Sequence, residues 1–381
     1  MPRNRIILSG IVQGVGFRPF VWRLASGMGL TGFVCNRGSE LLCEVQGDDA
    51  SLEAFAVRMI GEAPVNSRIE NVTRYSLPEQ SETSFCIIKS RWGEEGTGAG
   101  LSPDLALCED CRREMSDPSN RRYRHPFISC TACGPRYSIA LSIPYDRKNT
   151  SMKDFAMCPS CASEYETPSD RRYHAQPVAC HECGPTARLA GTGSEGYEAI
   201  RKTRDIILQG GIAVVKGIGG FHFFCDARDP EPVNRLRRIK GRREKPFAVM
   251  AHSDDVRRFA RVSDEEMRLL ESAAAPIVLL KKSPDCPLAG SVAPGSSLVG
   301  AMVPYTPLHH MLLCPGDVFV ATSGNLSGEP VCCSDRDAEE RLLPLADALL
   351  THDRPIVRPA DDSVVRCIEG EARMIRRSRG Y

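Results

Sequence analysis

The chain has 381 residues, 42% of them hydrophobic, and a formal net charge of +1 at pH 7. This length suffices for about two or three domains. The balanced charge gives no electrostatic case for nucleic acid or a membrane surface as a partner. The 17 cysteines occur without a signal peptide and without an apolar run of about 18 residues, which indicates a reducing cytoplasm and no membrane span.

The first stretch predicts a strand, a glycine-rich loop and a helix. Residues 5–12 have the composition of a strand, and residues 19–28 carry apolar side chains at helical spacing. Gln13-Gly14-Val15-Gly16-Phe17-Arg18 lies between them. Its glycines let backbone N–H groups converge on an anion before a helix N-terminus, and Arg18 offers a bidentate fork for phosphate oxygens. On glycine spacing alone, a plain tight turn explains the loop as well.

The next elements complete a β-α-β-β-α-β order. Residues 30–47 predict two strands joined at Asn36-Arg37-Gly38, residues 50–60 a helix, and strands follow near 69–76 and 84–89. Together with Gly10-Ile11-Val12-Gln13-Gly14-Val15-Gly16-Phe17-Arg18, this order resembles the acylphosphatase family. The resemblance implies a ferredoxin-like acylphosphatase domain over residues 1–91. It implies that the loop and Arg18 hold an acyl phosphate while Asn36 orients the attacking water.

Residues 93–100, Gly-Glu-Glu-Gly-Thr-Gly-Ala-Gly, predict a flexible linker. Four Cys-x-x-Cys pairs follow in two copies that are 50 residues apart, with 18 residues between the pairs of each copy. The pairs are Cys108/Cys111, Cys130/Cys133, Cys158/Cys161 and Cys180/Cys183. Two such pairs supply four thiolates to one tetrahedral metal. The spacing therefore predicts two structural Zn²⁺ ions in a tandem zinc-finger domain over residues 101–188, with four cysteines for each ion.

Other interpretations of the cysteines are weaker. Disulfides suit small secreted chains, a redox Cys-x-x-Cys occurs once rather than four times, and iron–sulfur spacings differ. The spacing leaves open whether a pair from one copy closes on a pair from the other. Arg121-Arg122-Tyr123 and Arg171-Arg172-Tyr173 are compatible with nucleic acid, but charge neutrality favours packed tyrosines and arginines that face solvent or acids. His125, His174 and His181 are predicted to lie outside the metal's ligand set.

The pattern becomes α/β after residues 190–196, whose Gly-rich composition predicts a second linker. A helix near 197–209 precedes a strand at 212–215 and a glycine-rich turn at 216–222. A basic helix ending in residues 236–246 leads into a strand at 247–250. A later strand, 318–321, ends in hydroxyl and amide side chains that suit a nucleotide.

The basic run and the polar strand end resemble the YrdC-like nucleotide-binding family, although a solvated helix face explains the basic run alone. The resemblance implies a domain over residues 195–381 that condenses ATP with a carbamate-type acid into an acyl-adenylate, with Mg²⁺ on the triphosphate. The matching positions are Lys240, Arg242, Ser323 and Asn325, to which we add the neighbouring Lys245. Residues 361–366 and Arg376-Arg377 fall where this fold completes its pocket.

Taken together, the chain is predicted to be an α+β multidomain protein: a ferredoxin-like acylphosphatase domain, two four-cysteine zinc-finger modules and a YrdC-like α/β domain. This order resembles the hydrogenase maturation carbamoyltransferases, the HypF family. The resemblance implies hydrolysis of carbamoyl phosphate, adenylation of the carbamate with ATP, and transfer of the carbamoyl group to the C-terminal cysteine of a HypE-type partner. That transfer supplies the cyanide ligands of [NiFe]-hydrogenase. Family members continue past Arg-Gly-Tyr into a further domain for the transfer itself, so we do not expect that step from these residues.

Two other hypotheses follow from the same residues. A tRNA-modifying, RNA-binding protein of the threonylcarbamoyl type would share the YrdC-like fold and the Arg-Arg-Tyr runs. The acylphosphatase signature argues against it, because such modification needs no phosphatase. A purely structural scaffold would leave Arg18 and the Lys240 region inert.

Overall fold

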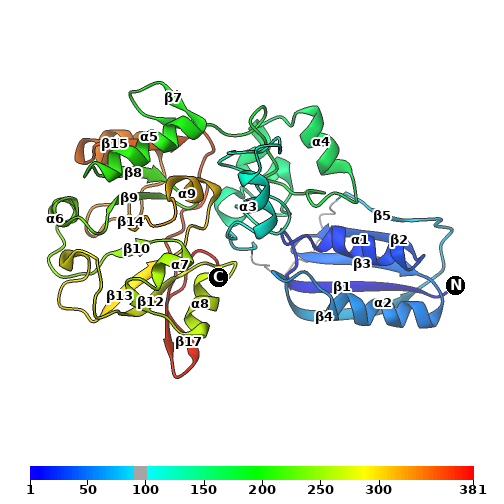
Figure 1. Cartoon of the computed structure of the whole chain (residues 1–381). Coiled ribbons are helices and arrows are strands. Elements are labelled where there is room, and N and C mark those ends of the chain that lie inside the picture. The colour runs from blue at the N-terminus through cyan, green and yellow to red at the C-terminus, as the bar shows by residue number, and fades with distance from the viewer. Residues whose placement is uncertain (90–100) are drawn as a thin grey trace. The chain divides into compact units, whose positions relative to one another are not determined.

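The computed structural model describes residues 1–89 and 101–381 (Figure 1). The predicted linker at 93–100 lies outside the described residues, as do the last two residues of the predicted first domain. The chain forms two compact units. One comprises residues 1–102, 129–132 and 139–178, and the other residues 103–128, 133–138 and 179–381. Within the described ranges, no helix is both long and apolar enough to cross a membrane.

The N-terminal sheet has the predicted β-α-β-β-α-β order, and the strand predicted near 84–89 is present as the shorter β5. Its elements are β1 Arg3–Ile11, α1 Phe17–Gly27, β2 Thr31–Arg37, β3 Glu40–Gln46, α2 Asp49–Gly61, β4 Arg68–Leu77 and β5 Phe85–Ile87. The strand order is β4-β1-β3-β2-β5, and only β5 pairs in parallel, with β2. Asn36 and Arg37 belong to β2 rather than to the turn, so the turn begins two residues later than predicted.

The core of this sheet lies under the two helices. Val21, Leu24 and Ala25 of α1 and Leu52, Phe55 and Met59 of α2 recur three or four residues apart, so each set forms one buried stripe. These stripes pack against Ile6 and Leu8, which are two residues apart and so lie on the same face of β1. Asp48 caps α2 by accepting a hydrogen bond from the Ser51 N–H at 2.9 Å.

The cysteine-rich segment contains little regular structure. Its helices are α3 Glu109–Ser116 and α4 Pro159–Glu166, and single 3-10 turns occupy Tyr137–Ile139, Arg147–Asn149 and Ser151–Asp154. The two copies fold alike: Cys108 and Cys158 are the N-caps of α3 and α4, and Arg124 and His174, 50 residues apart, share a left-handed φ of 55°.

A mixed sheet of 12 strands occupies the rest of the chain. Its strands run in the order β17-β16-β12-β13-β10-β14-β9-β8-β15-β6-β7, and β11 pairs with β12. The bounds are β6 Ala187–Leu189, β7 Ser194–Glu195, β8 Ala213–Lys216, β9 Phe221–Asp226, β10 Ala248–Met250, β11 Ala260–Arg261, β12 Ile277–Lys282, β13 Leu298–Met302, β14 Phe319–Ser323, β15 Ala348–His352, β16 Val364–Ile368 and β17 Glu371–Arg376. Its core includes Phe221, Phe223, Val249 and Val320 from adjacent strands.

Short helices and turns connect these strands. They are α5 Gly196–Leu208, α6 Pro230–Ile239, α7 Ser253–Val256, α8 Asp264–Leu270, α9 Pro307–Leu312, α10 Asp335–Asp337, the 3-10 turns Gly290–Val292 and Leu343–Leu345, and a π turn Ala338–Leu342. Two predictions were wrong here. Residues 190–196 are not a linker, because they form the turn of the β6–β7 hairpin, β7 itself and the start of α5. The basic helix ends at Ile239, since Gly241 takes a left-handed φ of 58°.

The close approach of β2 and β3 gives a test of the first sheet. Gly32 has a φ of +135°, and a Cβ there would lie 2.1 Å from the Glu44 carbonyl oxygen. We expect Gly32→Ala to destabilise this sheet by about 1–3 kcal/mol, which faster hydrogen exchange of the β2 and β3 amides would report. Gly27→Ala is the control, because a Cβ there meets nothing within 4 Å. Equal protection in both variants would contradict this account.

Candidate functional site

The glycine-rich loop between β1 and α1 is built to approach an anion. Gly14 and Gly16 have left-handed φ values of 72° and 79°, which other residues adopt only with strain. Gly16 is the N-cap of α1 without a side-chain capping bond, and no acidic residue occupies the first turn. Gln13 fixes the loop, because its Nε2 donates to the Gly38 and Glu40 carbonyls at 2.9 and 3.2 Å. The positive end of the helix dipole is therefore left for a ligand.

Arg18 and Asn36, the two predicted catalytic residues, are both buried. Arg18 lies in the first turn of α1, and Asn36 lies near the end of β2, whose turn Gln13 holds. Asn36 is 1% exposed, and within the described chain neither its amide oxygen nor its amide nitrogen has a hydrogen-bond partner. A buried amide without partners is costly, so it indicates a ligand or water at this position.

Asp146 is a residue near Arg18 that the sequence analysis missed. Its Oδ1 lies 3.2 Å from Arg18 Nη2, and the two side chains are 18% and 10% exposed. Asp146 comes from the second half of the cysteine-rich segment, 128 residues from Arg18. No local pattern in the sequence marks it.

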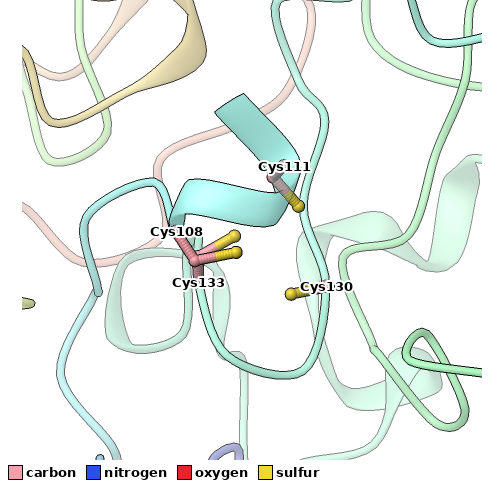
Figure 2. A group of neighbouring side chains, drawn as sticks. All are labelled: Cys108, Cys111, Cys130 and Cys133. Atoms are coloured by element: carbon pink, nitrogen blue, oxygen red, sulfur yellow. The ribbon is translucent and has the colours of Figure 1, made fainter. Parts of the chain in front are cut away.

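The eight predicted metal ligands form two clusters of four. Cys108, Cys111, Cys130 and Cys133 make one, Cys158, Cys161, Cys180 and Cys183 the other, and the sulfurs of each lie within 4.8 Å of one another. Figure 2 shows the first cluster, with its four sulfurs turned toward a common centre. Each copy of the repeat thus closes on itself. Four converging thiolates are the donor set of a structural zinc site, so these residues fit the predicted metal.

The second arginine of each Arg-Arg-Tyr run differs from prediction, whereas Arg121 of the first run is exposed as expected. Arg122 and Arg172 are 2% and 4% exposed, so they do not face solvent. Arg122 Nε donates to the Ala179 carbonyl at 2.8 Å, and Arg172 Nε donates to the Ser129 carbonyl at 3.2 Å. Each acceptor immediately precedes the third cysteine of the opposite copy, so the arginines tie the two copies together reciprocally. This role leaves Arg122 and Arg172 unavailable to a nucleic acid.

The histidines of this segment stay outside both four-cysteine groups, as predicted. His125 is buried, and its ring centroid lies 4.8 Å from that of His181. Burial, reinforced by His181, holds the pKa of His125 well below its usual range, so this ring is neutral near pH 7.

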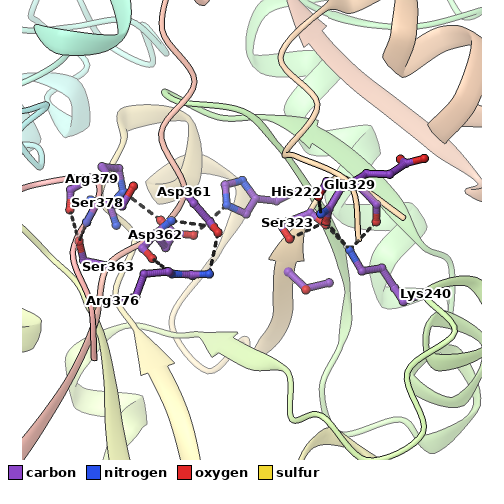
Figure 3. Close-up of polar contacts among 12 residues, drawn as sticks. His222, Lys240, Ser323, Glu329, Asp361, Asp362, Ser363, Arg376, Ser378 and Arg379 are labelled. Atoms are coloured by element: carbon purple, nitrogen blue, oxygen red, sulfur yellow. Dashed lines mark hydrogen bonds and ion pairs between the residues drawn. The ribbon is translucent and has the colours of Figure 1, made fainter. Parts of the chain in front are cut away.

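Three of the predicted nucleotide residues form one hydrogen-bonded group (Figure 3). Lys240, the C-cap of α6, donates from Nζ to the Ser323 carbonyl at 2.5 Å and to the Asn325 carbonyl and Oδ1 at 2.6 and 2.8 Å. Ser323 Oγ donates to Asn325 Oδ1 at 2.7 Å. Burial, reinforced by Arg242, lowers the pKa of Lys240 to about 7. None of these three acceptors is a carboxylate, so the charge of Lys240 is not balanced by the groups to which it donates.

Arg242 adds a second cation to this region, whereas Lys245 stays apart. Arg242 Nη1 donates to Thr322 Oγ1 at 3.2 Å, and burial lowers the pKa of Arg242. Lys245 is exposed, and its described contact is made by its backbone carbonyl, which accepts from Arg237 Nη2 at 3.2 Å. The buried Lys240 and the half-buried Arg242 fit polyphosphate binding better than the exposed Lys245 does.

A second polar group lies next to the Lys240 group, because the register of β9 and β14 pairs His222 with Ser323. His222 Nε2 lies 2.9 Å from Asp362 Oδ2, and Arg379 Nε donates to Asp362 Oδ1 at 2.9 Å (Figure 3). Arg376 pairs with Asp361 at 2.6 Å. The predicted late segment, residues 361–366 with Arg376, thus lies next to the Lys240 group. The sequence analysis did not predict His222 and Arg379 as members, because their partners are distant in sequence.

Three family models match successive parts of the chain. The model described as "Acylphosphatase" matches residues 4–87, "HypF finger" matches 107–140 and 157–190, and "Telomere recombination", the Sua5/YciO/YrdC model, matches 205–378. These matches and the sheets described above confirm the predicted fold class.

Relatives match the whole chain. The carbamoyltransferase HypF of Synechocystis sp. is 48% identical over 99% of this chain, and that of Rhizobium leguminosarum bv. viciae is 46% identical over 100%. A crystal structure of full-length HypF in the phosphate- and nucleotide-bound form covers 100% of the chain with a TM-score of 0.95 and 45% identity. The chain spans about half the length of each of these relatives, namely 50%, 49% and 50%.

The thiolate clusters give a direct test. We expect two zinc ions per chain in the native protein and one in Cys180→Ser, because the substituted hydroxyl is a poor replacement for one thiolate. Elemental analysis after exhaustive dialysis measures this. Cys314→Ser, which removes an exposed cysteine outside both clusters, should retain two. Iron in place of zinc, or equal metal content in both variants, would refute the assignment.

Proposed function

Because the chain belongs to the family of HypF carbamoyltransferases, we propose that it hydrolyses carbamoyl phosphate near Arg18 and adenylates the resulting carbamate near Lys240. The observation that carries this proposal is the presence, on one chain, of a glycine-rich loop with the buried Arg18, and of the buried Lys240 with the half-buried Arg242 at the end of β14. Carbamate is the product of the first reaction and the substrate of the second, so the two reactions form a series.

The first reaction needs positioning rather than a covalent nucleophile. Water attacks, the bond to phosphate breaks, and carbamate and inorganic phosphate leave. Arg18 and the α1 N-terminus would stabilise the charge on the phosphoryl oxygens. Asn36 would orient the attacking water, which accounts for its buried amide without a partner in the described chain.

The second reaction joins a carbamate oxygen to the α-phosphorus of ATP and releases pyrophosphate. Lys240 and Arg242 would neutralise the phosphates, and Ser323 and Asn325 would fix the nucleotide's orientation from the end of β14. Mg²⁺, when bound to the triphosphate, would supply further charge neutralisation. Lys245, being exposed, would at most add a rim charge.

We further propose two structural Zn²⁺ ions, a cytoplasmic location suited to a chain with 17 cysteines, and a HypE-type protein as acceptor of the carbamoyl group for [NiFe]-hydrogenase. An RNA-binding function is less supported. The relatives that match the full chain are carbamoyltransferases, and Arg122 and Arg172 of the runs that suggested RNA are buried. A scaffold would have no use for two adjacent cations, the buried Lys240 and the half-buried Arg242, whose hydrogen bonds within the described chain go to neutral acceptors.

Two sites in series predict an asymmetric pair of variants. With carbamoyl phosphate, ATP and Mg²⁺, Arg18→Ala should lower phosphate release by about 100-fold or more and suppress pyrophosphate release as well. Arg242→Ala should leave phosphate release intact and stop only pyrophosphate release. Both products are followed in one coupled assay.

Arg243→Ala is the matched control, because this exposed neighbour should leave both products unchanged. Equal loss of phosphate and pyrophosphate in a folded Arg242→Ala protein would contradict two sites in series. A native protein that releases neither product would contradict the proposed function itself.

The pKa of Lys240, lowered to about 7, predicts a pH dependence of ATP binding. Above pH 7 the free protein loses the Lys240 proton, whereas bound polyphosphate favours the ammonium form. ATP affinity should therefore fall as pH rises above 7, by up to about tenfold per unit. Titration calorimetry between about pH 7.5 and 9 measures this, and Lys240→Arg, which stays charged, should show little change. A flat native profile would contradict the shift.

A further inference from the structure

Asp146 has no obvious place in a site that binds only a phosphoryl group. Its carboxylate lies 3.2 Å from Arg18, the cation proposed to hold phosphate, and both side chains are largely buried. A carboxylate beside a phosphate dianion repels it, so a neutral side chain would serve simple phosphate binding better. A plain structural ion pair is the competing explanation, since buried arginines commonly pair with carboxylates.

The chain holds Asp146 firmly through its neighbour Arg147. The Arg147 N–H donates to Gln176 Oε1 at 2.6 Å, and its Nη1 donates to the Gln176 and Val178 carbonyls at 2.7 and 2.9 Å. Arg147 Nη2 also reaches the Phe155 carbonyl at 2.8 Å. The Asp146 carbonyl itself accepts from the Asn149 N–H at 2.7 Å. The carboxylate is therefore presented from an anchored turn.

The second copy of the cysteine repeat departs from the first at the residues that support this turn. Gln176 and His174 stand where the first copy has Pro126 and Arg124. Tyr165 donates its hydroxyl hydrogen to Gln176 Oε1 at 2.9 Å, and the His174 ring lies 5.1 Å from that of Tyr165. Burial, then Arg18, lowers the pKa of His174 to about 4, so His174 adds no charge near neutral pH.

We propose that Asp146 accepts a hydrogen bond from the amino group of carbamoyl phosphate and so makes the site prefer this substrate to acyl phosphates that carry an alkyl group. The inference rests on the proposed function. With the phosphoryl oxygens on Arg18, the carbamoyl end reaches the adjoining carboxylate. An ionised carboxylate only accepts hydrogen bonds, and the carbamoyl NH₂ donates two. The methyl group of acetyl phosphate donates no hydrogen bond. The Asp146 carboxylate would then lie beside the phosphate dianion without a donor from the substrate.

The test compares kcat/KM for carbamoyl phosphate and acetyl phosphate, measured as phosphate release. In Asp146→Ala the carbamoyl-to-acetyl ratio should fall at least about tenfold. Asp146→Asn should keep an intermediate ratio, because the amide oxygen still accepts a hydrogen bond. Asp154→Asn, at an exposed acid of the same segment, should leave the ratio unchanged.

The outcomes separate the explanations. An unchanged carbamoyl-to-acetyl ratio in a folded Asp146→Ala or Asp146→Asn protein with two bound metals would overturn the inference. If kcat/KM rises equally for both substrates, Asp146 is only a counter-ion of Arg18. If kcat/KM falls equally for both, Asp146 acts as a general base. If Asp146→Ala does not fold, the ratio of Asp146→Asn decides. A native protein that releases no phosphate from carbamoyl phosphate would refute the proposed function instead.

Discussion

The convergence of two clusters of four cysteine sulfurs is the constraint on which the middle of this chain depends. Between residues 103 and 185 the regular structure amounts to two eight-residue helices and three short turns, too little to bury a core of its own. The sulfurs converge in both copies, and each helix begins directly after the first cysteine of its cluster. The path of the intervening loops is thereby fixed at both ends.

Hydrogen bonds then join what the thiolates order. Arg122 and Arg172 each donate to the carbonyl just before the third cysteine of the opposite copy. Disorder in one cysteine cluster would therefore remove the acceptor of an arginine in the other copy. The second copy also carries the residues that anchor the turn presenting Asp146 to Arg18. The cysteine-rich segment thus contributes a charged group, the Asp146 carboxylate, to the surroundings of Arg18.

Much of this arrangement could be predicted from the sequence, because its signals are local. The Cys-x-x-Cys spacing predicted both cysteine clusters, and the glycine-rich loop with Arg18 marked the first candidate site. Asp146, His222 and Arg379 could not be found, since their partners are distant in the sequence and no pattern links them. Lys245 was included because three cations lie within six positions, yet the left-handed Gly241 turns the chain so that Lys245 stays exposed. Residues 190–196 misled because glycine and small polar residues suit a tight hairpin as well as a linker.

The chain passes back and forth between its two compact units, since residues 103–128 and 133–138 belong to one and residues 129–132 and 139–178 to the other. Neither unit is a continuous stretch of sequence. Any single cut within residues 103–178 would therefore divide both units, because each unit has residues on both sides of the cut. One proteolytic nick in this segment would interrupt both units at once.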